Sequence, residues 1–466
     1  MTRIWYSLNL FHGTVFKKEK IMKKTKLQQF LLPLSLALIC ISFNILISGH
    51  YLHKDLSSDE TLYNRIAIAL IDGDNYYLSG GSKVDLGIEV TPFYSAFVAA
   101  TYIIGGENHR NPIILNVLFN CLTILLLFYI IKMITNNIYI SFISSFVFIF
   151  YFLMWGHNFA VMMEITTVFF LTLTIYLYCK YYYKKTISFL YWSVAAFSIL
   201  TLINNRFIVL FAAFWVFQFF RTILEKINFR KSLIIPVIIS IILIAPWFIR
   251  QYLVYNQFVF FTPTWNNVVA DKIGILKKVN VRTDADGVEM NEPNDYNYYS
   301  EELKKEYGEN DKLRGSSAFT IEKYNELAGK RNIGENIFLS RLKNYFNLYN
   351  RDFKFQGPND FRLEVPSGTP FKIVQLFILL PLFIFSFLGI AIAFYKRDWI
   401  IILFGLFFFS HVILHVMIHF IDRYRVTILP VLVIITGYCL NQVIEMIRKT
   451  KMFSQMGSKI NIFSKD

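Results

Sequence analysis

Long apolar runs recur along this sequence, and few folds can accommodate them. A helix needs roughly 20 apolar residues to cross the hydrocarbon core of a bilayer, where every backbone polar group must be paired within the protein. Runs that approach this length lie near residues 30–49, 112–133, 138–154, 163–180, 187–203, 207–221, 232–249, 371–395, 398–419 and 424–445. We therefore predict an all-α polytopic membrane protein with about ten transmembrane helices.

The composition agrees with a membrane location. Hydrophobic residues make up 55% of the chain and charged residues only 17%, which excludes an ordinary soluble domain. The net charge is +15, but Lys and Arg lie mainly in short clusters between apolar runs, as they do in cytoplasmic loops. We therefore expect a surrounding lipid bilayer and no nucleic-acid partner.

The run "TPFYSAFVAATYIIGG" at 91–106 decides the orientation of every later helix. Only about 14 of its residues lie between the proline and the glycine pair, too few for an easy crossing. If this run does not cross, the later basic clusters all fall on the side of the N-terminus, at Lys132, 180–185, 221–231, 395–398 and 448–451. Because cytoplasmic loops carry the excess of Lys and Arg, we predict an interfacial helix on the outer face. Both termini are then cytoplasmic, in a multi-pass protein of the cell membrane.

The expected organisation is one membrane domain with insertions on its outer face. Residues 1–29 form a cytoplasmic N-terminus, in which Met22 is an alternative start, and 30–250 form a transmembrane module. That module contains a first outer loop, 50–111, with interfacial helices. A mainly helical extracytoplasmic insertion at 251–370, C-terminal transmembrane helices at 371–445 and a cytoplasmic tail at 446–466 complete the chain.

Two adjacent acids, Asp59 and Glu60, follow the first apolar run in the stretch "SSDETLYNRIAIALIDGDNYY". Near the outer membrane surface, a carboxylate can act as a general base on a hydroxyl group or hold a metal ion. The same acids also suit the first turn of a helix capped by Ser57 or Ser58. Residue chemistry alone leaves both interpretations open.

Several further segments follow in a characteristic order. After "DETLYNRIAIALIDGDNYY" come "TPFYSAFVAATYIIGGEN", "NPIILNVLFNCLTILLLFYIIK", "MMEITTVFFLTLTIYLY", "LINNRFIVLF", "APWFIRQYLVYNQFVFFTPTWNN" and "DRYRVTILPVLVIITG". With these segments the chain resembles the GT-C superfamily of membrane glycosyltransferases, nearest to the protein mannosyltransferase and lipid A aminoarabinose transferase branch, glycosyltransferase family 39. The resemblance covers most of 31–444 but not 271–370. It departs at "EVTP", where the aminoarabinose transferases have Glu-Lys-Pro, so transfer of aminoarabinose is unsupported.

The resemblance implies a reaction and its partners. A sugar would pass from a polyprenyl-phosphate donor to a glycan, lipid or protein acceptor on the extracytoplasmic face, with inversion at the anomeric carbon. The implied catalytic acids are Asp59, Glu60 and Glu164, with Glu164 at the outer mouth of its helix. The implied donor-phosphate ligands are Arg423, Arg425, Arg250 and Tyr424, and the implied cavity or acceptor residues include Glu89 and Arg206.

Each of these residues also has a simpler interpretation. Arginines at helix ends often extend to the membrane interface, and an acid such as Glu164 is stable at a helix N-terminus. No cofactor is certain from the sequence, although Glu60 and Glu164 are candidates for binding a divalent cation. Other functions left open are a lipid-linked glycan transporter and an O-antigen-type polymerase, neither of which predicts an acid pair after the first helix.

Three histidines, His411, His415 and His419, recur at intervals of four residues within one apolar run. They could bind a metal, relay protons, form hydrogen bonds between helices or line a donor cavity. A stripe of about 12 Å along a helix cannot place all three on one ion. The metal-site question therefore stays open, with His411 and His415 as cavity candidates.

Overall fold

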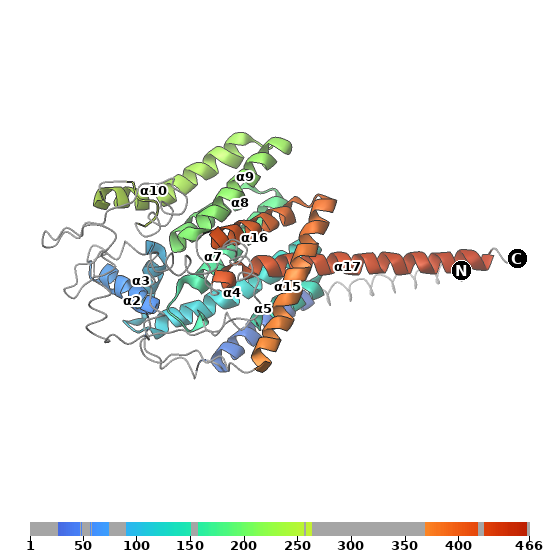
Figure 1. Cartoon of the computed structure of the whole chain (residues 1–466), viewed down its shortest axis with the longest axis horizontal. Coiled ribbons are helices and arrows are strands. Elements are labelled where there is room, and N and C mark those ends of the chain that lie inside the picture. Colours follow the sequence, from blue (N-terminus) through green and yellow to red (C-terminus); the bar gives the residue numbers. More distant parts are fainter. Residues whose placement is uncertain are drawn as a thin grey trace, which may run out of the picture.

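The structure is a computed structural model that describes residues 27–46, 48, 56, 58–73, 90–150, 157–255, 258–262, 369–417 and 424–463. Glu89, Arg423, His419 and the part of the insertion at 271–370 up to residue 368 lie outside the described residues. Every regular element among the described residues is a helix (Figure 1). This confirms the predicted all-α fold.

The helices follow the predicted apolar runs closely. After a first helix at Leu27–Leu46, the elements are α2 (Ser58–Ile71), α3 (Pro92–Gly105), α4 (Arg110–Thr135), α5 (Ile138–Ile149), α7 (Met163–Lys184), α8 (Ile187–Ile203), η2 (Asn205–Phe207), α9 (Ile208–Leu224), η3 (Arg230–Ile234), α10 (Ile235–Tyr255), α15 (Thr369–Lys396), α16 (Trp399–Met417) and α17 (Tyr424–Phe463). The element η3 is a short π-helix that leads directly into α10.

Seven helices of the described residues are long and apolar enough to cross a membrane, and the other predicted runs also form helices. Two of the predicted runs form helices of only 12 and 17 residues, α5 and α8. The third, α7, has 22 residues but carries Glu164, several threonines and several tyrosines, which lower its apolar character. These three helices pack against other helices of the bundle: α5 and α7 contact α4 and α17, and α8 contacts α7 and α10.

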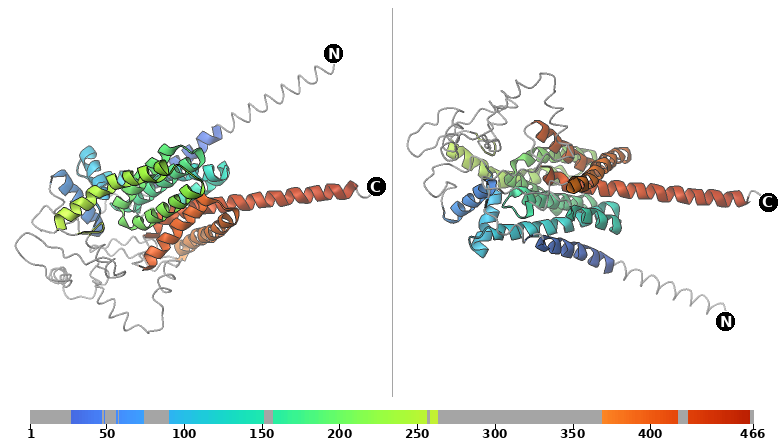
Figure 2. Two further views of the ribbon diagram at one scale, coloured as in Figure 1. Left: turned by 90° about the horizontal axis from the view of Figure 1, so that it is seen from above. Right: turned by 60° about the horizontal axis from the view of Figure 1, so that its bottom comes forward.

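The short helices α2 and α3 lie together at one end of the bundle, and α17 extends beyond the other end (Figures 1 and 2). In both figures α3 runs across the direction of α4, as an interfacial helix would. The helices α4, α7 and α15 end in Lys132, Lys184 and Lys396 within their last turns. All three end on the side from which α17 extends, so we call this side the basic end and the other the acidic end.

The first part of α17 lies at the centre of the bundle and packs against α4, α5, α7, α15 and α16. Small residues allow this close packing, as in many membrane proteins. A methyl group on Gly389 of α15 would lie 2.9 Å from the backbone oxygen of Ile435 in α17, closer than real contacts allow. The approach of α15 to α17 therefore depends on the absence of a side chain at Gly389.

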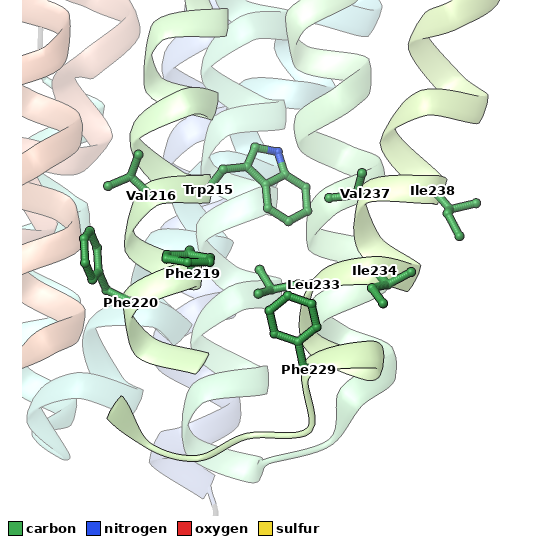
Figure 3. A pocket seen from close by; sticks show the side chains of 9 residues that line it. All are labelled: Trp215, Val216, Phe219, Phe220, Phe229, Leu233, Ile234, Val237 and Ile238. Atoms are coloured by element: carbon green, nitrogen blue, oxygen red, sulfur yellow. The ribbon is translucent and has the colours of Figure 1, made fainter. Parts of the chain in front are cut away.

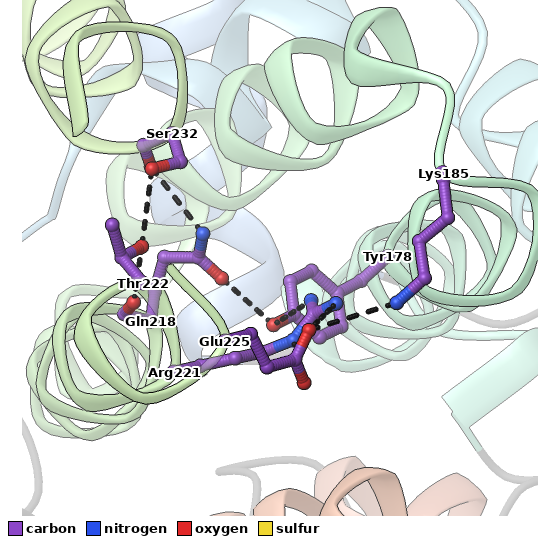
Figure 4. Close-up of polar contacts among 7 residues, drawn as sticks. All are labelled: Tyr178, Lys185, Gln218, Arg221, Thr222, Glu225 and Ser232. Carbon is purple, nitrogen blue, oxygen red and sulfur yellow. Dashed lines mark hydrogen bonds and ion pairs between the residues drawn. The ribbon is translucent and has the colours of Figure 1, made fainter. Parts of the chain in front are cut away.

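A polar network joins α7, α9 and η3 near the basic end (Figure 4). Arg221 is only 4% exposed, makes two hydrogen bonds to Glu225 of 3.0 and 3.1 Å, and donates to the Tyr178 hydroxyl. The Tyr178 hydroxyl donates in turn to Gln218. The sequence analysis counted Arg221 with the solvated basic loops, whereas the structure buries it in a paired network.

Substitution of Gly389 by alanine should destabilise the bundle. The new methyl group would meet both the Ile435 side chain at 2.8 Å and its backbone oxygen, which cannot move aside, and overpacking of this kind costs roughly 1–3 kcal/mol. Gly405→Ala is the matched control, since its methyl group would lie 3.3 Å from the movable side chain of Ile390. Thermal unfolding in detergent should show a larger decrease in Tm for Gly389→Ala. Equal decreases in the two variants would contradict the proposed close contact.

Candidate active site

The acid pair lies in the first turn of α2, where the positive end of the helix dipole favours negative charge. Asp59 is half-buried, whereas Glu60 is only 2% exposed. The Oε1 atom of Glu60 accepts a hydrogen bond of 2.9 Å from the backbone N–H of Val161. The two neighbours therefore differ: Glu60 attaches α2 to the segment before α7, and Asp59 is the more accessible acid.

The segment at 157–162 is held from three directions. Besides Glu60, the Asn116 side chain of α4 donates to the carbonyl oxygen of Ala160 at 2.8 Å. Asn158 donates to the side chain of Asn44 in the first helix at 2.9 Å. The segment leads into α7, whose first turn carries Glu164, also 2% exposed. These hydrogen bonds fix the place of Glu164 relative to the acid pair.

The interfacial helix α3 adds a buried tyrosine to the two buried acids. The rings of Tyr94 and Tyr63 meet edge to face, 4.7 Å apart. Burial raises the pKa of Tyr94 well above its ordinary value, and Tyr63 and the carboxylates of Glu164 and Glu60 raise this pKa further. Tyr94 therefore keeps its proton at neutral pH.

The polar break between α8 and α9 lies beside the start of α3. The Thr91 hydroxyl, one residue before α3, donates to the Ile203 carbonyl at the last residue of α8. The Asn204 side chain then accepts from the backbone N–H of Arg206 and begins the short helix η2. Arg206 is half-buried within η2.

The histidine stripe connects α16 to α17. The Nε2 atom of His411 lies 3.2 Å from the Thr427 hydroxyl, and the Nδ1 atom of His415 lies 2.8 Å from the carbonyl oxygen of His411. The two imidazole rings stack with centroids 4.0 Å apart, and both are buried. Among the alternatives left open by the sequence, hydrogen bonding between helices is therefore the one observed for His411.

Arg425 lies two residues before Thr427, in the first turn of α17, and is 5% exposed. Tyr424 begins this helix, although its side chain is outside the description. The ring of Phe207, the residue after Arg206, lies 6.3 Å from that of His411. The break between α8 and α9 is therefore close to the α16–α17 contact.

Arg250 belongs to a different set of contacts. It donates to the side chain of Gln251 and lies over the ring of Trp247. Both Gln251 and Trp247 donate to the carbonyl oxygen of Phe261, at 2.6 and 2.7 Å, and thereby hold the segment 258–262 against α10. The described contacts thus make Arg250 part of this anchor.

One apolar cluster connects the two parts of the site. It contains Ile66 of α2, Leu202 of α8, Trp247 of α10, Phe261 and Leu414 of α16. The cluster therefore joins α2, α8, α10 and α16 at the acidic end. In the described part of the chain no three His, Cys, Asp or Glu side chains gather as a metal site would require.

The sequence analysis missed Tyr94 and the asparagines Asn44, Asn116 and Asn158. Each asparagine lies within or beside an apolar run, where an amide is costly without a partner. A single amide within an apolar run could therefore have identified the asparagines from the sequence. The sequence carried no such signal for Tyr94, because an aromatic residue in an interfacial helix is common.

Comparisons with known proteins support the fold. No family model matches the chain, and no curated protein matches it. A crystal structure of ArnT from Cupriavidus metallidurans bound to undecaprenyl phosphate is similar over 88% of this chain and 60% of that one, at 12% identity and a TM-score of 0.45. The Archaeoglobus fulgidus oligosaccharyltransferase, tethered to an acceptor peptide, is similar over 89% of this chain and 49% of that one, at 13% identity and a TM-score of 0.52.

The likeness to the archaeal oligosaccharyltransferase is one of fold, and it confirms the GT-C fold implied by the sequence motifs. This chain spans about half the length of that enzyme and 60% of the length of ArnT.

The structural role of Glu60 can be separated from a role of its charge. Glu60→Ala removes the acceptor for Val161 and should lower the free energy of unfolding by roughly 1.5–3 kcal/mol, the range for a hydrogen bond to a charged group. Glu60→Gln keeps an acceptor oxygen and should cost clearly less. Thermal unfolding measures both, with Asp72→Ala, at an exposed acid just after α2, as control. A glutamine variant as unstable as the alanine variant would contradict the anchoring role.

Proposed function

We propose that this protein is a membrane glycosyltransferase that moves a sugar from a polyprenyl-phosphate donor to a glycan, lipid or protein acceptor at the acidic end of the bundle. The observation that carries the proposal is half-buried Asp59 next to buried Glu60, whose hydrogen bond to Val161 holds the segment that leads to buried Glu164. The archaeal neighbour with this fold is itself an oligosaccharyltransferase. The orientation predicted from the basic loops places this end outside the cell.

Asp59 is the proposed general base. The acceptor hydroxyl attacks the anomeric carbon, its proton passes to the Asp59 carboxylate, and the bond from the anomeric carbon to the phosphate oxygen breaks. The attack comes from the side opposite the leaving phosphate, so configuration inverts. Because a phosphate is already a good leaving group, one general base and stabilisation of the phosphate charge are sufficient for the transfer reaction.

Arginine is suited to the departing polyprenyl phosphate, because its planar guanidinium binds two phosphate oxygens at once. Arg425, at the start of α17, is the proposed ligand among the described residues. Stabilisation of charge as it develops lowers the barrier to transfer. Arg423, two residues before Arg425 in the sequence motif, is proposed as a second phosphate ligand.

The remaining acids have supporting roles in the proposal. Glu60 positions the segment at 157–162, and Glu164 with the protonated Tyr94 orients the acceptor by hydrogen bonds. Glu60 and Glu164 are also the carboxylates that could hold a divalent cation, and the proposed reaction does not depend on one. Glu89 and the stacked pair His411 and His415 are proposed to shape the cavity.

The decisive variant is Asp59→Asn, which preserves shape and removes the base. In a deletion strain complemented with this variant, we expect unchanged protein abundance and a decrease in the transferred glycan of roughly 100-fold or more, typical for loss of a general base. Mass spectrometry of surface glycans measures the product. Asp72→Asn, at the opposite end of the same helix, is the matched control and should retain the product.

Two results would contradict this proposal. Unchanged glycan with Asp59→Asn would exclude Asp59 as the base. A deletion strain that completes its lipid-linked glycans but keeps them on the inner face would identify a transporter instead.

A further inference from the structure

An apolar groove of about 560 Å³ lies between α9 and α10 at the basic end of the bundle (Figure 3). All nine side chains that line it are apolar. Those used below are Trp215, Val216, Phe219 and Phe220 of α9 and Leu233 and Val237 from the η3–α10 side. Both helices are candidate membrane spans, so the groove opens towards the hydrocarbon rather than towards water.

Polar contacts also join α9 to η3 beside the groove. The Gln218 side chain donates to the Ser232 carbonyl at 3.3 Å, and the Thr222 and Ser232 hydroxyls lie 3.1 Å apart (Figure 4). Ser232 lies within the π-helical turn η3, and π-helical turns are frequent at functional sites. The two helices are thus fixed by buried hydrogen bonds beside the groove, which is preformed.

Exposed positive charge lies at the end of the groove. Lys226, Arg230 and Lys231 are exposed in the connection from α9 and the first turn of η3. The acid in the same connection, Glu225, is bound to Arg221 through two hydrogen bonds. The local charge that a ligand meets is therefore positive.

The dimensions indicate what the groove holds. From Phe229 to Ile238 the groove follows ten residues of helix, about 15 Å at 1.5 Å per residue. This is half of a hydrocarbon core of about 30 Å, the depth of one leaflet. A partner helix would contact a full span, and a polyprenyl chain is far longer than one leaflet is deep. A lipid acyl chain matches both the length and the wholly apolar lining.

We propose that this groove binds an anionic glycerophospholipid, with one acyl chain between α9 and α10 and the phosphate group at Arg230 and Lys231. Guanidinium and ammonium groups attract lipid phosphates at a membrane surface. This site lies at the opposite end of the bundle from the proposed active site, and the inference does not depend on the proposed function.

Native mass spectrometry of the purified full chain tests the proposal with phosphatidylglycerol and phosphatidylcholine of identical chains. We expect phosphatidylglycerol to be retained roughly tenfold more strongly, from the charge contacts of the two basic residues. The double variant Arg230→Gln, Lys231→Gln should lose this preference. Its matched control, Arg448→Gln, Lys449→Gln, removes one Arg and one Lys from the exposed part of α17 and should retain it.

The wild-type chain offers a second measurement, since Trp215 lines the groove. Phosphatidylglycerol with brominated chains should quench tryptophan fluorescence more than brominated phosphatidylcholine does. That difference should disappear in Trp215→Phe and decrease in Val237→Phe, whose larger side chain fills the groove without adding a tryptophan.

Four outcomes would overturn the proposal. The first is equal retention of both lipids by the wild-type chain, and the second is equal loss of preference in the two double variants. The third is displacement of phosphatidylglycerol by an equal concentration of undecaprenyl phosphate, which would identify the carrier lipid as the occupant. The fourth is a dimer that masks Trp215 from both brominated lipids, which would place a second copy in the groove.

Discussion

Hydrocarbon offers no water to satisfy a buried polar group, so a polar side chain inside a membrane bundle is stabilised by a partner in the protein. The consequence is visible at several junctions between helices. Glu60 binds a backbone N–H, Thr91 binds the last carbonyl of α8, and Gln218 binds the carbonyl of Ser232. These hydrogen bonds join elements that are distant in the sequence, and they determine which helix ends come together.

The two ends of the bundle use this constraint differently. At the acidic end, polar contacts bring the first turn of α2, the start of α7 and the α8–α9 break around α3. At the basic end, Arg221 and Glu225 neutralise each other, and the exposed Lys226, Arg230 and Lys231 remain at the membrane surface. The middle of the bundle is held by apolar packing and by close approach at Gly389. Such packing provides rigidity without polar groups in the hydrocarbon.

Much of the fold could be predicted from the sequence, because apolar length and the placement of Lys and Arg respond directly to the bilayer. The predicted run at 91–106 appears as α3, a helix of 14 residues that runs across the bundle. The number of spans was less predictable. Helices such as α7 lie among other helices, where an acid and several threonines are tolerated, so a protein-lined helix need not be apolar throughout.

The sequence by itself determined that this chain is a helical membrane protein with an acid pair after its first apolar run, since both features are local and read directly from residue order. Only the tertiary structure decided how the members of that pair differ, because burial and the partner Val161 depend on a segment about a hundred residues away. The same is true of Tyr94, of the His411–Thr427 contact and of buried Arg221. Each acquires its role from a neighbour brought close by helix packing, and such neighbours cannot be identified from residue spacing along the chain.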